Sequence, residues 1–409
     1  MNDNSTSKQA SKQASKQAST LKRESGIEFL KIFAILLIIT SHVVQTLGSE
    51  PSFLPVNDYV VKIEEVTTDP KMLILSMLRY SGAFGNTIFF ICSAWFLIGR
   101  KRNEKPKALQ MLADNWMVSI LILVLFLGTY GRINGSLALR AAFPFYFSNN
   151  WYINCYIAFL LLYPLLNILI ERLDQRTHSR IVFFLMLWVF LLPFSGEPFE
   201  FLFGARPNMF CGDLGNWCAI YIIIAYLKRY RQKRMNSTGF SLTLVLVGFF
   251  GTYGLVLVAN LLGLHFSAFK ESLTMWNAGT AHPFLILMVI GLLNLARKVK
   301  TKNALVNYIS GLSFFIYIVH ENILVRSLLR PAMWQYVYEK YGYGHILTLV
   351  FAQVAFVFVA SLVVSMLYYH TFHRLIVLVC KQLYPRASGI FCRLENRRSI
   401  DENGMNFEE

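Results

Sequence analysis

IEFLKIFAILLIITSHVVQTL, residues 27–47, is mostly apolar and long enough to form a helix that crosses a membrane. A helix rises by about 1.5 Å per residue, and the hydrocarbon layer of a bilayer is about 30 Å thick. Two ionisable residues lie within this stretch: Lys31 near its start and His42 beyond its middle. Ionisable side chains are costly inside a membrane, so both are candidates for a functional role.

The spacing of these two residues strengthens that interpretation. Lys31 and His42 are separated by an interval close to three helical turns at about 100° per residue. Both side chains therefore share one helical face, about 16 Å apart along the axis. The alternative is that the lysine extends to the membrane edge while the histidine is hydrogen-bonded within a helix bundle.

The composition is typical of a polytopic membrane protein. Of 409 residues, 55% are hydrophobic and only 15% are charged. The formal net charge is +16, but the basic residues cluster between apolar runs, so we expect no nucleic-acid partner. The six cysteines show no metal-ligand spacing, and we expect no metal site.

The hydropathy pattern predicts an all-α polytopic membrane protein with about ten transmembrane helices. The expected spans are residues 27–47, 73–98, 112–131, 152–170, 181–194, 213–227, 240–263, 283–296, 306–326 and 346–370. Together they form a ten-helix membrane domain, residues 27–370. An even number of spans places both termini on one side, and Lys and Arg are concentrated in the segments of that side. We therefore predict a multi-pass protein of the cell (plasma) membrane, with both termini cytoplasmic.

Two polar tails flank the membrane domain. Residues 1–26 contain three Ser-Lys-Gln-Ala repeats and are predicted to be a disordered, basic cytoplasmic tail. Residues 371–409 are predicted to be a cytoplasmic C-terminal tail with a short interfacial helix at its start.

Several polar residues are expected at one depth in the membrane. The ninth span runs in the same direction as the first, and its His320 and Glu321 lie as far from its start as His42 does in the first. Arg79 lies toward the outer end of the second span. This layer predicts a site in the outer half of the bundle. Hydrogen bonds that only specify helix packing are the alternative.

Four stretches resemble, in order, the membrane acyltransferase 3 family. The first stretch has an acidic residue and then a basic residue, which ten residues separate from a histidine. Here these three residues are Glu28, Lys31 and His42. The others are FGNTIFFICSAWFL (84–97), NWY (150–152) with LYPLLN (162–167), and SFFIYIVH (313–320). The chain departs from the family where many members have Arg in place of Lys31 and Gly in place of Ala94. Lysine can still hold a phosphate as a point charge.

The resemblance implies transfer of an acyl group, usually acetyl from acetyl-CoA, to a carbohydrate hydroxyl across the membrane. A phosphate-bearing donor entering from the cytoplasm needs cations near the inner face, and Lys31, Arg100 and Arg102 are the candidates. His42 is the expected general base, because histidine suits proton transfer near neutral pH. A transient acyl-histidine is the other possible role of His42. The expected partners are an acyl-CoA donor, a cell-surface or lipid-linked glycan acceptor and membrane lipid.

Supporting roles are assigned to a further set of residues. Glu28 lies one turn before Lys31 and is expected to orient it, or else to be solvated. Candidates for binding the acceptor or stabilising developing negative charge are Arg79, Trp151, Tyr317, His320 and Glu321. For Trp151 the alternative is the aromatic belt of the membrane interface, and for Tyr317 an interhelical hydrogen bond.

A transporter, flippase or polymerase of a surface-polysaccharide pathway is the alternative function. Such proteins also have ten or more helices and scattered intramembrane charge. Transporters commonly contain internal repeats with helices broken at matching positions, whereas Pro164 and Pro193 have no counterparts in the second half of this chain. The acyltransferase is therefore the preferred prediction.

Overall fold

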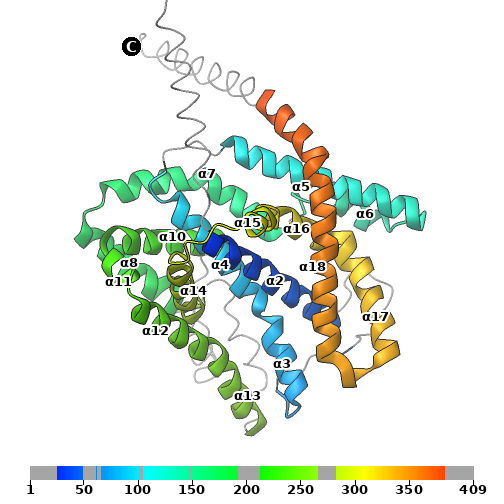
Figure 1. Ribbon diagram of the computed structural model, residues 1–409, viewed down its shortest axis with the longest axis horizontal. Helices are drawn as coiled ribbons and strands as arrows, with labels where there is room; N and C mark the ends of the chain where they lie inside the picture. Colours follow the sequence, from blue (N-terminus) through cyan, green and yellow to red (C-terminus); the bar gives the residue numbers. More distant parts are fainter. Residues whose placement is uncertain are drawn as a thin grey trace, which may run out of the picture.

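The computed structural model describes residues 25–48, 61, 66–100, 105–147, 149–191, 212–265 and 282–382. Within these ranges every regular element is a helix, which confirms the all-α class (Figure 1). Five helices are long and apolar enough to cross a membrane: Ser25–Leu47, Pro106–Tyr130, Trp151–Arg172, Thr238–His265 and Tyr343–His370. The full set of ten spans and the side on which the termini lie remain predictions.

The expected tails fall largely outside the described residues. Of the predicted N-terminal tail, only Ser25 and Gly26 are described, and they form the first turn of α2 (Ser25–Gly48). Of the predicted C-terminal tail, residues 371–382 are described, and residues 372–382 are helical.

Helix α2 lies at the centre of the molecule. It contacts α4 (Ser81–Leu97), α15 (Ala304–Gly311), α16 (Ser313–His320) and α18 (Ile346–His370) (Figure 1). Ile35 and Ile38 of α2 are fully buried. The start of α2 is fastened by Ser25, whose hydroxyl accepts from the Asn303 amide at 2.6 Å and donates to Asn307 Oδ1 at 3.0 Å. The start of α2, less than two turns before Lys31, is thus held by the surrounding bundle.

The contact between α2 and α4 is unusually close. Gly85 of α4 lies against the backbone carbonyl of Ala34, and a Cβ atom there would overlap that oxygen. Gly82, nearly one turn earlier, lies against the side chain of Ser41. Glycine lets the two backbones approach, as small residues do between membrane helices.

Replacement of Gly85 by alanine is expected to destabilise the protein by about 1–3 kcal/mol, because a rigid backbone atom occupies the space of the new methyl group. Gly128→Ala is the matched control, since Gly128 is also helical but has nothing near its missing Cβ. The control should be neutral or slightly stabilising, because alanine favours the helix. Thermal unfolding in detergent measures both variants, and equal unfolding temperatures would contradict the close contact.

Two of the expected spans are interrupted helices. The region 73–98 consists of α3 (Pro70–Arg79) and α4, with a turn at Tyr80 between them. The region 306–326 consists of α15 and α16, and the helix ends at His320 before η6 (Val325–Leu329) and α17 (Arg330–Tyr341). Side chains satisfy the backbone at these breaks. Ser81 Oγ donates to the Leu78 carbonyl in the last turn of α3 at 2.6 Å, and Asn322 Oδ1 accepts from the Leu324 amide at 3.0 Å.

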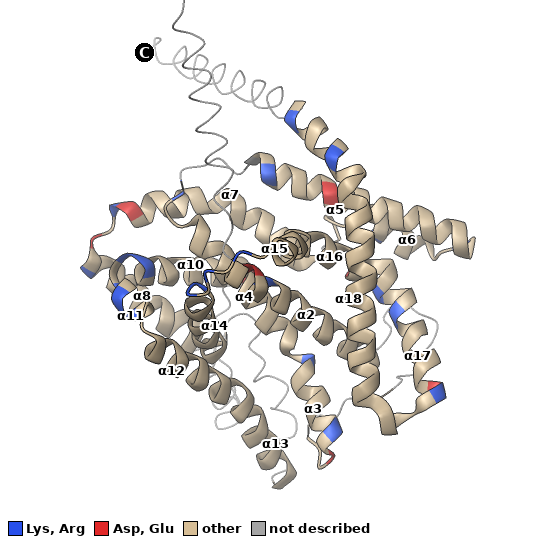
Figure 2. Ribbon diagram, viewed as in Figure 1, with Lys and Arg blue, Asp and Glu red and all other residues tan. Residues whose placement is uncertain are grey.

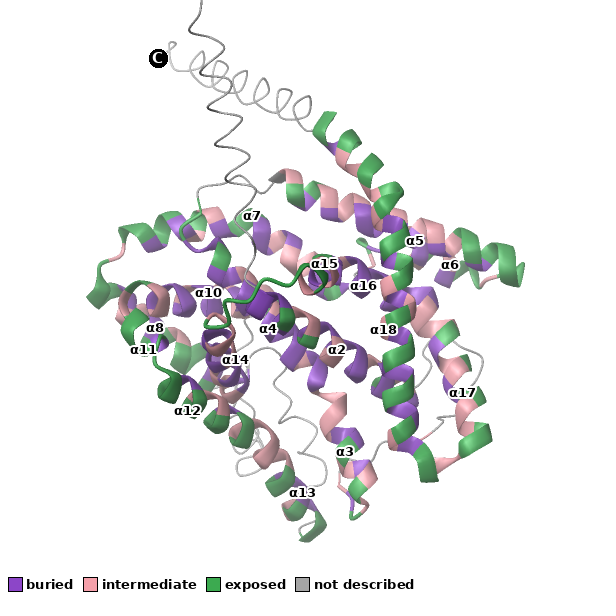
Figure 3. Ribbon diagram, viewed as in Figure 1, coloured by how far each residue is buried: buried purple, intermediate pink, exposed green. Residues whose placement is uncertain are grey.

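The other helices surround this centre. They are α5 (Lys105–Tyr130), α6 (Gly135–Ala142), α7 (Trp151–Arg172), α8 (Gln175–Leu185), η1 (Met186–Leu191), α10 (Gly212–Tyr230), α11 (Gln232–Met235), α12 (Thr238–Phe249), η2 (Phe250–Gly254), α13 (Leu255–His265), α14 (Pro283–Ala296) and η7 (Tyr343–His345). In Figure 3, α2 and α4 are largely buried, whereas α5, α12 and α18 each expose one side. The exposed side of α18 carries Phe351, Phe356 and Leu367, as expected of a surface that faces lipid.

Candidate functional site

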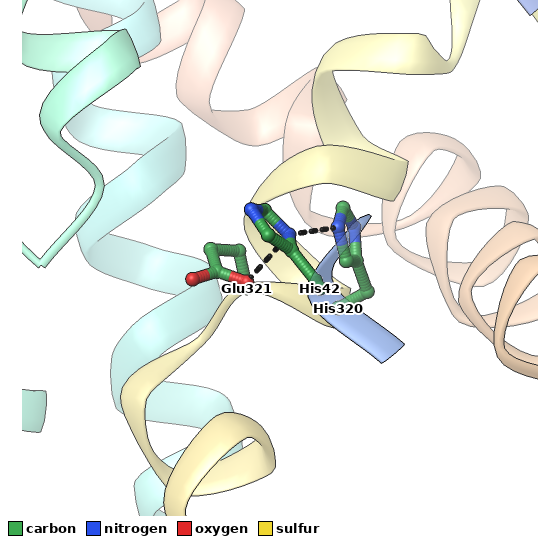
Figure 4. Close-up of side chains that lie close together, drawn as sticks. All are labelled: His42, His320 and Glu321. Atoms are coloured by element: carbon green, nitrogen blue, oxygen red, sulfur yellow. Dashed lines mark hydrogen bonds and ion pairs between the residues drawn. The ribbon is translucent and has the colours of Figure 1, made fainter. Parts of the chain in front are cut away.

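Three ionisable side chains meet where α16 ends against α2 (Figure 4). His42 Nδ1 lies 2.8 Å from Glu321 Oε2 and 3.1 Å from His320 Nε2. His320 and Glu321 are buried, at 1% and 5% exposure, while 15% of the His42 side chain remains accessible. His42 is thus the member of the cluster that a reactant can reach.

The hydrogen bonds assign the protons on both imidazole rings. His320 Nδ1 lies 2.7 Å from the Ile316 carbonyl, which can only accept, so His320 carries its proton on Nδ1. His320 Nε2 is then an acceptor, as is the Glu321 carboxylate, and His42 Nδ1 donates to both. In the neutral ring this leaves His42 Nε2 without a proton; both dashed contacts of His42 in Figure 4 start from the other ring nitrogen, Nδ1. A nitrogen lone pair in this position can act as a base.

Two arginines hold the carboxylate of Glu321. Arg326 donates to Oε1 at 3.1 Å, and Arg330 donates to Oε2 at 3.0 Å. The Arg330 side chain is only 2% exposed, whereas the Arg326 side chain is 41% exposed. A buried carboxylate needs charged partners, and these two guanidinium groups supply them. Glu321 is therefore fixed in a position where it orients His42.

The backbone near His42 is irregular on two sides. The break before α4 meets α2 where Ser41 Oγ donates to the Arg79 carbonyl, and the break after α16 places Glu321 beside His42. On α17, the fully buried Trp334 donates its indole N–H to the Val43 carbonyl at 2.9 Å. Interrupted helices at membrane depth occur where the backbone is enclosed by protein or lines a cavity. Their convergence on His42 is typical of a functional site.

A second cluster lies toward the start of α2. Lys31 Nζ is 3.2 and 3.3 Å from the two carboxylate oxygens of Glu28, and it lies 5.8 Å from the ring centre of Phe96. Glu28 is buried and also accepts from Ser310 Oγ at 2.5 Å. Glu28 therefore contacts Lys31 as the sequence suggests, and it is not a solvated carboxylate.

Three of the remaining candidates, Arg79, Arg100 and Trp151, lie outside α2 and α16. Arg79 approaches α2 through its backbone carbonyl, and Arg100 is exposed just after α4. Arg102 lies outside the described residues. Trp151 begins α7, is 38% exposed and contacts Tyr152 edge to face at 5.8 Å.

Tyr317 joins the His42 cluster to a group of aromatic residues. Its ring lies 5.7 Å from that of His320 and 5.8 Å from that of Tyr152, and Tyr152 in turn contacts Trp217 at 4.9 Å. These rings link α16 to α7 and α10. Tyr317 is thus placed to fix the orientation of His320 by packing.

Arg326, Arg330 and Trp334 are absent from the residues chosen from the sequence, although they support the site directly. From the charge pattern, the two arginines belong to a loop outside the membrane. A local signal does exist: they lie four residues apart, on one helical face, shortly after an acidic residue in an apolar span. For Trp334 no local signal exists, because its partner Val43 is remote in sequence.

The cluster also has the composition of a metal site. Ligand atoms of His42, His320 and Glu321 lie within 4.8 Å of one another. However, the nitrogens and the carboxylate already bond to one another, and Arg326 and Arg330 place two positive charges on Glu321. A divalent ion would be repelled by these charges. We therefore interpret the cluster as hydrogen-bonded, and the absence of a metal remains a prediction.

Comparison with known proteins gives one match. A family model described as an acyltransferase domain matches residues 24–370. The match begins just before α2 and ends with α18, so it includes both clusters. No curated protein and no solved structure matched the chain.

Proposed function

We propose, from the premise that the chain belongs to the acyltransferase 3 family, that it is an integral-membrane O-acyltransferase. It moves an acyl group, acetyl by resemblance to the family, from cytoplasmic acyl-CoA to a hydroxyl group. The acceptor is an extracytoplasmic or lipid-linked glycan.

One observation carries this proposal: His42 Nδ1 is bonded to Glu321, which leaves Nε2 as the free base of a side chain that is 15% exposed. A side chain that donates one ring proton to a fixed carboxylate and offers the other nitrogen to a hydroxyl is the arrangement that acyl transfer requires. Lys31 adds a cation about 16 Å away along the same helix. That distance is comparable with the extended pantetheine arm of a CoA thioester.

The reaction follows from these positions. His42 Nε2 removes the proton of the acceptor hydroxyl while the hydroxyl oxygen attacks the thioester carbonyl carbon. The positive charge that develops on the imidazole is stabilised by Glu321. When the tetrahedral intermediate collapses, the carbon–sulfur bond breaks and His42 returns its proton to the departing CoA thiolate. The products are an O-acyl ester and free CoA.

His320 and Glu321 act here as positioning groups. Each accepts a hydrogen bond from His42 Nδ1, and the remaining His320 nitrogen donates to the Ile316 carbonyl. Neither therefore has a proton to offer the carbonyl oxygen of the substrate. Arg326, the more exposed of the two arginines on Glu321, is the nearby cation that could reach that oxygen.

The proposed orientation places the start of α2 at the cytoplasmic face of the plasma membrane. Basic residues occur near the start of α5, around α8 and α11, between α14 and α15, and after α18 (Figure 2). Fewer lie near α3 and α17, at the opposite end of α2. In this orientation Lys31 meets the donor, and His42 meets an acceptor that reaches the membrane from outside.

Replacement of Lys31 by glutamine is expected to raise the KM for acyl-CoA about tenfold and leave kcat nearly unchanged, because a phosphate contact contributes mainly to donor binding. Lys31→Arg should retain most of the affinity, and it keeps a partner for the buried Glu28. Lys71→Gln is the matched control, since Lys71 also lies over an aromatic ring, Tyr343, but near the opposite end of α2. An unchanged KM for Lys31→Gln would contradict the donor assignment.

The test of the function is transfer of radiolabelled acetyl from acetyl-CoA in inverted membrane vesicles that contain the protein. We expect label in a glycan fraction, with none in vesicles that lack the protein. No transfer from any short acyl-CoA, together with failure of glycan export in cells without the protein, would favour the transporter alternative.

A further inference from the structure

The chain between α5 and α7 turns back along α5. Helix α6 begins soon after the end of α5 and packs against it (Figure 1). The carbonyl of its last residue, Ala142, accepts from Trp116 Nε1 at 3.0 Å. Along the axis of α5, Trp116 lies about 21 Å before the end of the helix at Tyr130. The C-terminus of α6 therefore lies well inside the candidate span Pro106–Tyr130 and not at its outer end.

The backbone of this returning chain is satisfied by protein groups. Backbone amides donate to the carbonyls of Leu139, Phe143 and Pro144. Side chains donate to the other carbonyls of the stretch: Asn149 Nδ2 to Arg140, Ser119 Oγ to Ala141, Trp116 Nε1 to Ala142 and Asn154 Nδ2 to Phe145. Every carbonyl from Leu139 to Phe145 thus has a donor, as backbone at membrane depth requires. Residues 135–147 therefore form a re-entrant segment.

Aromatic side chains of the re-entrant segment are exposed at this depth. Phe143, Phe145 and Tyr146 are 53%, 48% and 81% exposed. They lie between Ala142 and Asn150, and Asn150 Nδ2 donates to Asn115 Oδ1 of α5 at 2.8 Å. Exposed rings on a backbone that needs no water indicate contact with lipid. Because they lie far below the outer end of α5, the aromatic belt of the membrane interface does not account for them.

The re-entrant segment is connected to the His42 site. Ser119 Oγ donates to the Ala141 carbonyl at 2.7 Å and accepts from Asn322 Nδ2 at 3.1 Å. Asn322 directly follows Glu321, which bonds to His42. A lipid bound on the re-entrant segment would therefore lie next to the elements that hold the proposed base.

A cation marks the outer end of the re-entrant segment. Arg132 is exposed in the turn between α5 and α6. No Asp or Glu occurs between Asp114 and Glu171 in the sequence, so the charges that this part of the chain carries are positive. A ligand that matches this surface has an anionic group near the outer end of α5 and a long apolar chain that descends along α6.

We propose that Arg132 and the rings of Phe143, Phe145 and Tyr146 bind the polyisoprenyl diphosphate anchor of a lipid-linked glycan. The diphosphate contacts Arg132, and the isoprenoid chain lies along α6 on the three rings. The inference rests on the proposed function, and it selects the lipid-linked acceptor from the two acceptor classes named there. Ordinary phospholipid is the competing occupant. The connection to Glu321 favours the acceptor, because bulk lipid has no need of a place beside the site.

The test is titration of undecaprenyl diphosphate, and of undecaprenol as its uncharged analogue, into the purified full-length protein in nanodiscs of zwitterionic phospholipid. Native mass spectrometry measures the bound fraction of each probe. The double variant Phe143→Ala/Tyr146→Ala is expected to raise the Kd for both probes about tenfold, because two aromatic contacts are lost. Arg132→Gln should raise the Kd for the diphosphate about tenfold and leave that for undecaprenol unchanged. Arg132→Lys keeps the charge and should bind the diphosphate within about threefold of the parent.

Matched controls come from other exposed positions. Phe351→Ala/Phe356→Ala also removes two exposed aromatic side chains, but from α18, and Lys340→Gln removes an exposed cation from the last turn of α17. Neither variant should alter the Kd for either probe. Unfolding temperatures within about 2 °C of the parent would show that the variants are folded. If Phe143→Ala/Tyr146→Ala and Arg132→Gln bind undecaprenyl diphosphate as tightly as the parent, the inference is wrong.

Phosphatidylglycerol is the third probe. If the variants weaken its binding as much as they weaken that of undecaprenyl diphosphate, the surface holds bulk lipid only and the inference fails. Binding is measured without acyl-CoA, so it is separable from the proposed function. A parent protein that binds undecaprenyl diphosphate through these residues but transfers no acyl group would retain the docking surface and reject the function. Acyl transfer by the parent, with unaltered binding of the probe in the variants, would do the reverse.

Discussion

Replacement of His42 by alanine is expected to lower kcat for acyl transfer by about 10²–10⁴-fold, because the base that accepts the hydroxyl proton is lost. Of the four imidazole nitrogens of His42 and His320, only Nε2 of His42 has no hydrogen-bond partner within the cluster of His42, His320 and Glu321. The KM for acyl-CoA should change little, since the donor phosphates are proposed to bind at the other end of α2. Transfer of label from acetyl-CoA, measured over a range of donor concentrations, separates the two effects.

His345→Ala is the control for removal of a histidine. His345 is exposed and precedes α18, outside both clusters of α2. Its variant should transfer acetyl groups at the rate of the parent. Activity of His42→Ala equal to that of the parent would exclude His42 as the base, even if the family reaction were established.

Replacement of Glu321 by glutamine is expected to lower kcat by at least about 10²-fold. The amide of glutamine can donate to His42 Nδ1, and this favours the tautomer that carries its proton on Nε2 and cannot act as a base. The same change leaves Arg330, which is 2% exposed, without its counter-charge. We therefore also expect a loss of stability of about 3 kcal/mol, measured by thermal unfolding.

A second substitution separates these two consequences. Arg330→Met removes the buried charge left by Glu321→Gln, and the double variant should recover most of the lost stability. It should not recover activity, because His42 still lacks the carboxylate. Glu171→Gln, an exposed change on α7, is the matched control and should alter neither property. Recovery of activity in the double variant would show that Glu321 only compensates Arg330.

Parts of the site were predictable because they depend on local sequence. Lys31 and His42 are recognisable as ionisable residues in one apolar helix, and counting along the ninth span places His320 and Glu321 at the depth of His42. The structure brings His42, His320 and Glu321 together. It also joins Glu28 to Lys31, a contact that follows from their spacing of three residues in one helix.

Other parts depend on how helices are broken and rotated. Hydropathy shows an apolar run but not an interruption within it, so the breaks after Arg79 and His320 are absent from the expected spans 73–98 and 306–326. The interruption after His320 brings Arg326 and Arg330 back onto Glu321. Because the charge pattern places both arginines outside the membrane, their role was not predictable.

The sequence by itself determined that this protein is helical, enters a membrane and belongs to an acyltransferase family, because apolar length, charge distribution and ordered motifs are properties of consecutive residues. Only the tertiary structure decided which groups meet: Trp334 with the carbonyl of Val43, Arg330 with Glu321, and Trp116 with the carbonyl of Ala142. Those contacts depend on the rotation of each helix about its axis and on close approaches such as that of Gly85 to Ala34. Such packing is set by the shapes of many remote residues together, and no local pattern encodes it.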